Sequence, residues 1–327
     1  MEDVSKLDLG AIYERLLQTM PPHEADQSIE WIRKIRELKI QKNVCILGHN
    51  YMTPDVFYGI SDYVGDSLGL SRKAVETEAD IILFNGVHFM AETAKILNPN
   101  RLVLIADLEA GCSLAESITA EDVQKLKREH PGTPVVTYIN CTAAVKAETD
   151  VCCTSANALK IIESLLEQKI IFLPDEYLAR NIRLKTKKEI ISWEKGKCVV
   201  HEQYTAEDIA DARRHFDDLV VISHPECNTD VTTASDFSGS TSQMENFIRN
   251  SGKTNIMLVT ECSMGDNLRT VFPEKHFVTS CHTCPYMKLI TLEKIYDSLL
   301  NEKFAVEVPE EIQIPARRAL ERMLELS

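Results

Sequence analysis

The chain has 327 residues, and its 36 Lys and Arg residues against 50 Asp and Glu residues give a formal net charge of −14. This charge repels phosphate groups and no basic cluster offsets it, which disfavours nucleic acid and anionic membranes as partners. The acidic start differs from a signal peptide, and no apolar run reaches the roughly 18 to 20 residues of a membrane span, so we expect a cytoplasmic protein.

Residues 1–40 predict two helices. Apolar residues recur there at helical spacing, and Pro21 and Pro22 separate the two runs. We expect this segment to serve packing rather than chemistry.

From residue 41 a unit of strand, loop and helix recurs, with three such units in each of three long repeats, at 41–130, 131–216 and 217–285. The nine predicted strands are 44–47, 81–84 and 102–105, then 135–138, 170–173 and 197–200, then 219–222, 256–259 and 276–279. Short apolar strands that alternate with helices indicate parallel sheets covered on both faces. The predicted fold is α/β, with three small doubly wound α/β/α domains related by pseudo-threefold symmetry around a central active site. Residues 286–327 predict C-terminal helices that pack on the first repeat.

Ten cysteines in a reducing compartment are expected to be thiols, metal ligands or redox groups rather than a disulfide framework. Cys112, Cys198 and Cys284 stand 86 residues apart, which suggests that each repeat delivers one thiolate to a shared centre. Cys141 and Cys227 have the same spacing, but Asp55 occupies the third position of that series. Three protein ligands leave a metal or cluster with an open position, which suits catalysis. Buried structural thiols, or a zinc ion with Cys281 as fourth ligand, are the alternatives.

Small hydroxyl residues open a helix in each repeat, at Ser67, at Ser155 and at Ser240 with Thr241. Helix N-termini present free backbone N–H groups and a partial positive charge. We therefore expect these positions to bind anions despite the acidic composition.

Seven motifs resemble the quinolinate synthase family, in the order of that family and from about residue 43 to the C-terminus. They are Gly48-His-Asn-Tyr51, Val64-Gly-Asp-Ser-Leu68, Gly86-Val-His-Phe-Met-Ala-Glu-Thr-Ala-Lys95, Glu109-Ala-Gly-Cys-Ser-Leu114, Thr154-Ser-Ala-Asn157, His224-Pro-Glu226 and Cys284-Pro-Tyr-Met287. The resemblance implies an enzyme of NAD biosynthesis that condenses iminoaspartate with dihydroxyacetone phosphate to quinolinate, with loss of phosphate and water.

The resemblance also implies one 4Fe-4S cluster per chain, with one iron open to substrate as a Lewis acid. Its ligands would be Cys112, Cys198 and Cys284, the same three residues that the spacing selects. Some family members carry a third cysteine near the last ligand, where this chain has Val278. A redox disulfide that uses this third cysteine is therefore excluded.

Motif matches and residue chemistry assign the remaining site. Glu226 and Tyr51 are the candidates for acid and base catalysis, with His201 and His224 as proton carriers. The predicted substrate-binding residues are His49, Ser67, Phe89, Tyr138, Asn140, Ser155, His201, His224, Glu226, Ser240 and Thr241. Glu92, Lys95 and Glu261 are weaker candidates, because surface charge is the default for such residues.

The predicted partners are the two small substrates, and the enzyme that produces iminoaspartate is a candidate for transient coupling. Two other functions stay open. One is another Fe-S hydro-lyase, and the other is a cluster carrier or redox sensor that uses Cys281 and Cys284. The sequence assigns no role to Cys141, Cys152, Cys153, Cys227, Cys262 and Cys281.

Overall fold

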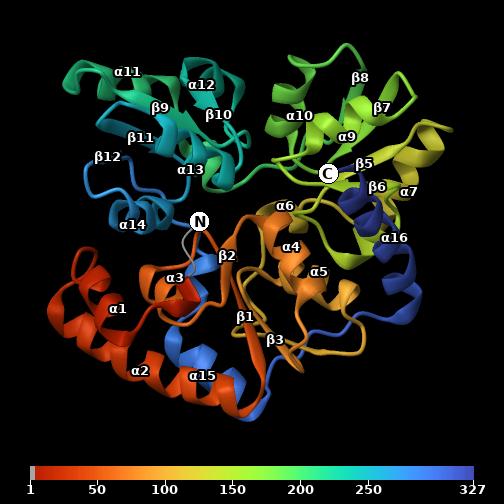
Figure 1. Cartoon of the computed structure of the whole chain (residues 1–327). Helices are drawn as coiled ribbons and strands as arrows, with labels where there is room; N and C mark the ends of the chain where they lie inside the picture. Colours follow the sequence, from red (N-terminus) through yellow and green to blue (C-terminus); the bar gives the residue numbers. More distant parts are fainter. Residues whose placement is uncertain (1–3) are drawn as a thin grey trace. The chain divides into compact units, whose positions relative to one another are not determined.

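The computed structural model describes residues 4–327, with Thr279 described by its backbone alone (Figure 1). The first three residues of the predicted segment 1–40 thus lie outside the described residues. The other residues of that segment form α1 (Leu9–Leu16) and α2 (Pro22–Gln41), after a short 3-10 turn at Val4–Lys6. Pro22 opens α2, where its missing N–H costs no hydrogen bond. Ile12 and Ile32 are fully buried, as expected for helices that serve packing.

Three four-stranded parallel sheets form the framework, and all three share one strand order. The first sheet runs β2-β1-β3-β4, with β1 at Val44–His49, β2 at Tyr63–Gly65, β3 at Ile81–Asn85 and β4 at Leu102–Ile105. The second runs β6-β5-β7-β8, with β5 at Val135–Tyr138, β6 at Val151–Cys153, β7 at Lys169–Leu173 and β8 at Glu189–Ser192. The third runs β10-β9-β11-β12, with β9 at Val220–Ser223, β10 at Phe237–Ser238, β11 at Asn255–Val259 and β12 at His276–Thr279. The predicted class of three doubly wound α/β domains is confirmed.

Helices alternate with these strands along the chain. They are α3 (Pro54–Gly59), α4 (Ser67–Glu76), α5 (His88–Leu97), α6 (Ser113–Glu116), α7 (Ala120–Glu129), α8 (Ala143–Ala147), α9 (Ala158–Ser164), α10 (Glu176–Arg183), α11 (Ala206–His215), α12 (Thr229–Ala234), α13 (Thr241–Asn250), α14 (Cys262–Val271), α15 (Leu292–Asn301) and α16 (Glu310–Leu326). Two further 3-10 turns lie at His201–Gln203 and Met287–Leu289. No helix of the described residues combines the length and apolar character needed to cross a bilayer.

The chain divides into two compact units. The described part of the first holds residues 4–111, 261–273 and 283–307, which include the first sheet. The second holds Cys112–Thr260, Glu274–His282 and Val308–Ser327, which include the second and third sheets.

The prediction of a strand at 197–200 is wrong. The fourth strand of the second sheet lies at Glu189–Ser192, whereas residues 197–200 form no strand. Gly196 instead makes an isolated bridge with Asp175, and a side chain at Gly196 would meet the Pro174 carbonyl oxygen at 1.9 Å. This close approach of two backbones leads the chain away from the sheet before Cys198. The edge strands β2, β6 and β10 were not predicted.

Two domain boundaries also differ from the prediction. Residues 112–130, assigned above to the first repeat, belong to the second unit, because Ile118 and Val123 share a buried cluster with Val135 and Ile171 of the second sheet. Helix α14, assigned to the third repeat, belongs to the first unit, where the Asn267 carboxamide donates to the carbonyl oxygens of Asn50 and Met52.

The two C-terminal helices pack against different repeats. Helix α15 packs against α2 and β4 of the first repeat, as predicted. Helix α16 packs instead against α8, α9 and β6 of the second repeat (Figure 1). Its buried residues Ala316, Ala319, Leu320 and Met323 form one apolar stripe. Such a stripe specifies that a helix packs, but not against which sheet.

Candidate functional site

The loops after the first strands of two sheets hold a histidine in the same way. In the first sheet the Tyr51 backbone N–H donates to Nδ1 of His49, at 3.2 Å. In the third sheet the Glu226 backbone N–H donates to Nδ1 of His224, at 3.4 Å. Because Nδ1 accepts in both, Nε2 carries the proton of the neutral ring and faces other partners as a donor.

The equivalent position of the second sheet is Asn140, which follows β5. Its buried side-chain oxygen has no hydrogen-bond partner among the described residues. A buried acceptor without a partner costs free energy, so this atom is suited to accept from a bound ligand.

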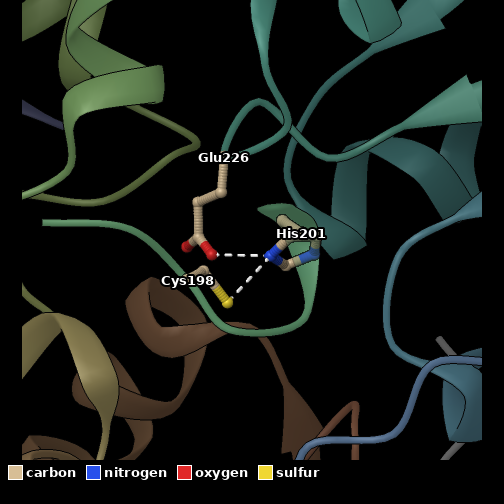
Figure 2. A group of neighbouring side chains, drawn as sticks. All are labelled: Cys198, His201 and Glu226. Atoms are coloured by element: carbon tan, nitrogen blue, oxygen red, sulfur yellow. Dashed lines mark hydrogen bonds and ion pairs between the residues drawn. The ribbon is translucent and has the colours of Figure 1, made fainter. Parts of the chain in front are cut away.

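Three side chains of the second unit form a compact group, shown in Figure 2. Nδ1 of His201 lies 2.8 Å from Oε2 of Glu226 and 3.2 Å from the Cys198 sulfur. The ligand atoms of all three residues lie within 4.8 Å of one another. His201 and Glu226 are buried, whereas Cys198 is half-buried. The group thus brings a thiol, an imidazole and a carboxylate close together.

Further residues surround Glu226. The Tyr138 hydroxyl donates a short hydrogen bond to Oε1 of Glu226, and Nδ1 of His224 lies 3.8 Å from the same oxygen. The His201 and His224 rings stack with centroids 4.6 Å apart. Burial by itself raises the pKa of the Glu226 carboxyl, but His224 and His201, with the hydrogen bonds from His201 and Tyr138, hold that pKa below its usual range. Glu226 is therefore ionised at neutral pH, so the buried site contains a carboxylate.

Two positioning residues of this group were not predicted. Thr260 Oγ1 lies 3.0 Å from Nε2 of His201 and fixes the ring from its other side. The Asn181 carboxamide donates to the carbonyl oxygens of Pro225, at 2.9 Å, and Cys227, at 2.8 Å, the two residues that flank Glu226. Both lie outside the motifs, and a lone Thr or Asn carries no signal in the sequence.

Burial separates the predicted cluster ligands from the other free cysteines. Cys112, Cys198 and Cys284 are half-buried, whereas Cys45, Cys141, Cys152, Cys153 and Cys227 are buried. Burial also raises the pKa of the Cys152 thiol well above its usual value, which makes this thiol inert. Among these eight residues, only the three predicted ligands are thus partly exposed.

Cys112 and Cys198 both lie in the second unit, after β4 and β8 in the chain. Burial raises the pKa of the Cys198 thiol well above its usual value, and the nearby Glu226 and Cys112 raise it further. The backbone N–H groups of Val200 and His201 act in the opposite direction. Two close sulfurs with N–H donors form a set that suits a cationic iron centre, which would remove the repulsion between thiolates.

Cys284 lies in the first unit and has a similar local structure. The backbone N–H groups of Tyr286 and Met287 lower the pKa of its thiol, whereas burial raises it. Its own N–H donates to Oε1 of Glu261 at 3.3 Å, and that buried carboxylate also pairs with Lys288 at 2.8 Å. Lys288 donates to the Tyr51 carbonyl oxygen at 3.2 Å. Glu261, considered weak above, thus holds the Cys284 loop.

The predicted anion-binding helix starts differ in detail. Helix α4 begins at Ser67, but Asp66 caps it. Helix α13 begins at Thr241, and Ser240 caps it in a capping box with Gln243. Helix α9 begins only at Ala158, so Ser155 lies in the turn before it. Ser155 lines a cavity of about 510 Å³ together with Gly239 and Gln243.

The predicted residues therefore fall into two sets. The structure brings together Tyr138, Cys198, His201, His224 and Glu226. Within the first unit lie His49, Tyr51, Ser67, Phe89 and Cys284, of which His49 and Tyr51 are in contact. Phe89 is buried on α5, which fits a role in shape.

Comparison with known proteins shows which family this chain matches. A sequence model described as Quinolinate synthetase A protein (NadA) matches residues 33–325. "Quinolinate synthase 1" of Mesorhizobium japonicum is 50% identical over 315 residues, which cover 96% of this chain and 97% of that protein. "Quinolinate synthase" of Xylella fastidiosa (strain Temecula1) is 52% identical over 293 residues, which cover 90% of this chain and 86% of that protein. "Quinolinate synthase" of Agrobacterium fabrum is 47% identical over 321 residues, 98% of this chain and 93% of that protein.

Proposed function

The chain belongs to the quinolinate synthetase A family of NAD-biosynthetic enzymes, and from that premise we propose that it condenses iminoaspartate with dihydroxyacetone phosphate. The products are quinolinate, phosphate and two waters, which balance the atoms of the two substrates. The observation that carries the proposal is the buried pair of Glu226 and His201, at 2.8 Å, beside the Cys198 sulfur.

The proposed cofactor is one 4Fe-4S cluster held by Cys112, Cys198 and Cys284. When bound, it supplies an open iron that acts as a Lewis acid on a hydroxyl or carbonyl oxygen of the triose. Two observations support this ligand set: the three thiols are half-buried while five others are buried, and backbone N–H groups surround Cys198 and Cys284.

The proton transfers are assigned to the residues around Glu226. The ionised carboxylate removes a proton next to a carbonyl group, and the adjacent His201 and His224 stabilise it and carry protons onward. Tyr138 orients the carboxylate through its short hydrogen bond, and Tyr51 serves as a proton relay.

Binding of the anionic substrates is assigned to polar groups of the loops. Nε2 of His49 and His224 acts as a donor, because Nδ1 of each ring accepts a backbone N–H. Ser67, Ser155, Ser240 and Thr241 supply hydroxyl and backbone N–H groups for carboxylate and phosphate oxygens. Asn140, whose buried side-chain oxygen has no hydrogen-bond partner within the described part of the chain, accepts from a hydroxyl or imine N–H.

The decisive test combines metal analysis with product analysis. The protein is reconstituted with iron and sulfide without oxygen, its iron and sulfide are counted, and quinolinate is measured after addition of both substrates. Cys112→Ala, Cys198→Ala and Cys284→Ala should lose iron and activity, whereas Cys45→Ala, a buried thiol, should keep both. Iron without quinolinate would favour another Fe-S hydro-lyase or a cluster carrier, and zinc in place of iron would contradict the cofactor.

The cellular context is part of the same proposal. An oxygen-sensitive cluster requires the reducing cytoplasm, and an unstable substrate such as iminoaspartate favours transient coupling to the enzyme that produces it.

A further inference from the structure

A single hydroxyl joins the two predicted ligand segments of the second unit. Ser113 directly follows Cys112, and its Oγ donates to the Lys197 carbonyl oxygen at 3.0 Å. The same Oγ accepts the backbone N–H of Val199 at 3.1 Å. Lys197 and Val199 are the two neighbours of Cys198 in the chain. Ser113, which follows Cys112, therefore holds the peptide groups on both sides of Cys198.

Two further contacts hold the segment that precedes Cys198. Nε1 of Trp193 donates to the Ser117 carbonyl oxygen at 3.0 Å, just past the end of α6. At the other side, Gly196 packs on the Pro174 carbonyl, where a side chain does not fit. With the segment fixed at these points, the Ser113 hydroxyl decides the local position of Cys198 relative to Cys112.

We propose that Ser113 is a positioning residue that sets the separation of the Cys112 and Cys198 sulfurs and thereby the retention of the metal centre. The identity of that centre rests on the proposed function. The geometry of the Ser113 bridge does not depend on the proposed function, because all of its hydrogen bonds join residues of one unit. A hydroxyl that both donates and accepts suits this task, since it satisfies a carbonyl and an N–H that face each other.

The test compares Ser113→Ala with Ser113→Thr, which keeps the hydroxyl, and with Ser164→Ala, which removes a hydroxyl bonded only within α9. After anaerobic reconstitution, loss of iron in air is followed by visible absorbance. We expect Ser113→Ala to lose iron about tenfold faster than the other two variants, with an unchanged melting temperature. Equal rates in all three would overturn the inference.

A second measurement separates this inference from the identity of the cofactor. The protein without iron is titrated with Cd²⁺, a soft ion that prefers thiolates, and binding is followed by the thiolate-to-metal absorbance. Ser113→Ala should bind Cd²⁺ about tenfold more weakly than wild type, and Cys112→Ala should bind it more weakly still. Unchanged Cd²⁺ affinity would overturn the inference even if the chain assembled no cluster. If Ser113→Ala does not fold, Ser113→Val and Ser113→Thr, which share one shape, give the same comparison.

Discussion

Nδ1 of His201 lies 2.8 Å from Oε2 of Glu226, and both side chains are buried. A carboxylate held this way stays ionised at neutral pH and is available to accept a proton from a bound substrate, but its lowered pKa makes it a weaker base than a free carboxylate. Glu226→Gln keeps the shape but removes the base, so we expect quinolinate formation to fall by about 10² to 10⁴-fold.

The same variant distinguishes a general base from a metal ligand. If Glu226 is not a ligand, Glu226→Gln should bind as much iron as wild type. Glu202→Gln, an exposed neighbour of His201, should keep both activity and iron. Loss of metal from Glu226→Gln would instead indicate that Cys198, His201 and Glu226 hold a single ion, and full activity would remove Glu226 from the mechanism.

The ion pair of Asp107 and Lys294 joins the end of β4 to α15, with 2.5 Å between Oδ2 and Nζ. Burial raises the pKa of the Asp107 carboxyl, but the hydrogen bonds from Lys294 and the Glu109 N–H outweigh this and hold it below its usual value. A lowered folded-state pKa stabilises the fold above the ordinary pKa of 3.8, and this stabilisation is lost as pH falls through the folded value. Asp107→Asn should lower stability at pH 7 by about 0.2 to 1 kcal/mol.

Urea midpoints of wild type and Asp107→Asn at neutral and acid pH check this prediction. The gap between the two proteins should close as the pH falls through the lowered pKa of Asp107, because residue 107 is then uncharged in both proteins. Asp217→Asn, at an exposed position, should show no gap at either pH. A gap that persists in acid would contradict the role of the carboxylate charge.

Strand periodicity predicted most of the framework, because apolar runs such as those of β1, β5 and β9 leave little choice in a parallel sheet. It failed at 197–200, whose β-branched residues have strand propensity but follow Gly196. The backbone contact of Gly196 with Pro174 is set by tertiary packing, which local propensity does not contain. The short edge strands were missed because two or three residues show no alternation.

Motif matches and residue chemistry predicted Tyr138, His201, His224 and Glu226, which the structure brings into contact. They assigned no role to Ser113, Asn181 or Thr260 and gave Glu261 only as a weaker candidate, although these residues hold the loops of the site residues and of the cysteines. These four act through hydrogen bonds between segments far apart in the chain. Only the fold reveals such pairs.

A substitution of Asn181 tests whether these hydrogen bonds position the Glu226 loop. Its side-chain NH₂ group donates to the carbonyl oxygens of Pro225 and Cys227, and its oxygen accepts from the hydroxyls of Thr229 and Thr232, each at 3.0 Å. Asn181→Asp places a carboxylate oxygen against two carbonyl oxygens and shifts the Glu226 loop. We expect kcat to fall at least tenfold, because a small displacement of a reacting group is costly.

Asn246→Asp is the matched control, because Asn246 lines the same cavity as Asn181 but is exposed. It should leave kcat unchanged. Iron content should be equal in both variants, since neither residue lies beside a predicted ligand. If Asn181→Asp raised KM alone, Asn181 would serve substrate binding rather than the position of Glu226.

Gly196 provides the sharpest test of how the chain reaches Cys198. A Cβ atom at this position would lie 1.9 Å from the Pro174 carbonyl oxygen, so one of the two backbones must move. Gly196→Ala should cost about 1 to 3 kcal/mol of stability, as overpacking does, and should displace the segment that carries Cys198. Gly252→Ala, where the added Cβ meets nothing within 4 Å, should be neutral or slightly stabilising. Melting temperature and anaerobic iron content of the two variants check the prediction. An unchanged melting temperature and full iron content in Gly196→Ala would show that the contact with Pro174 does not fix the position of Cys198.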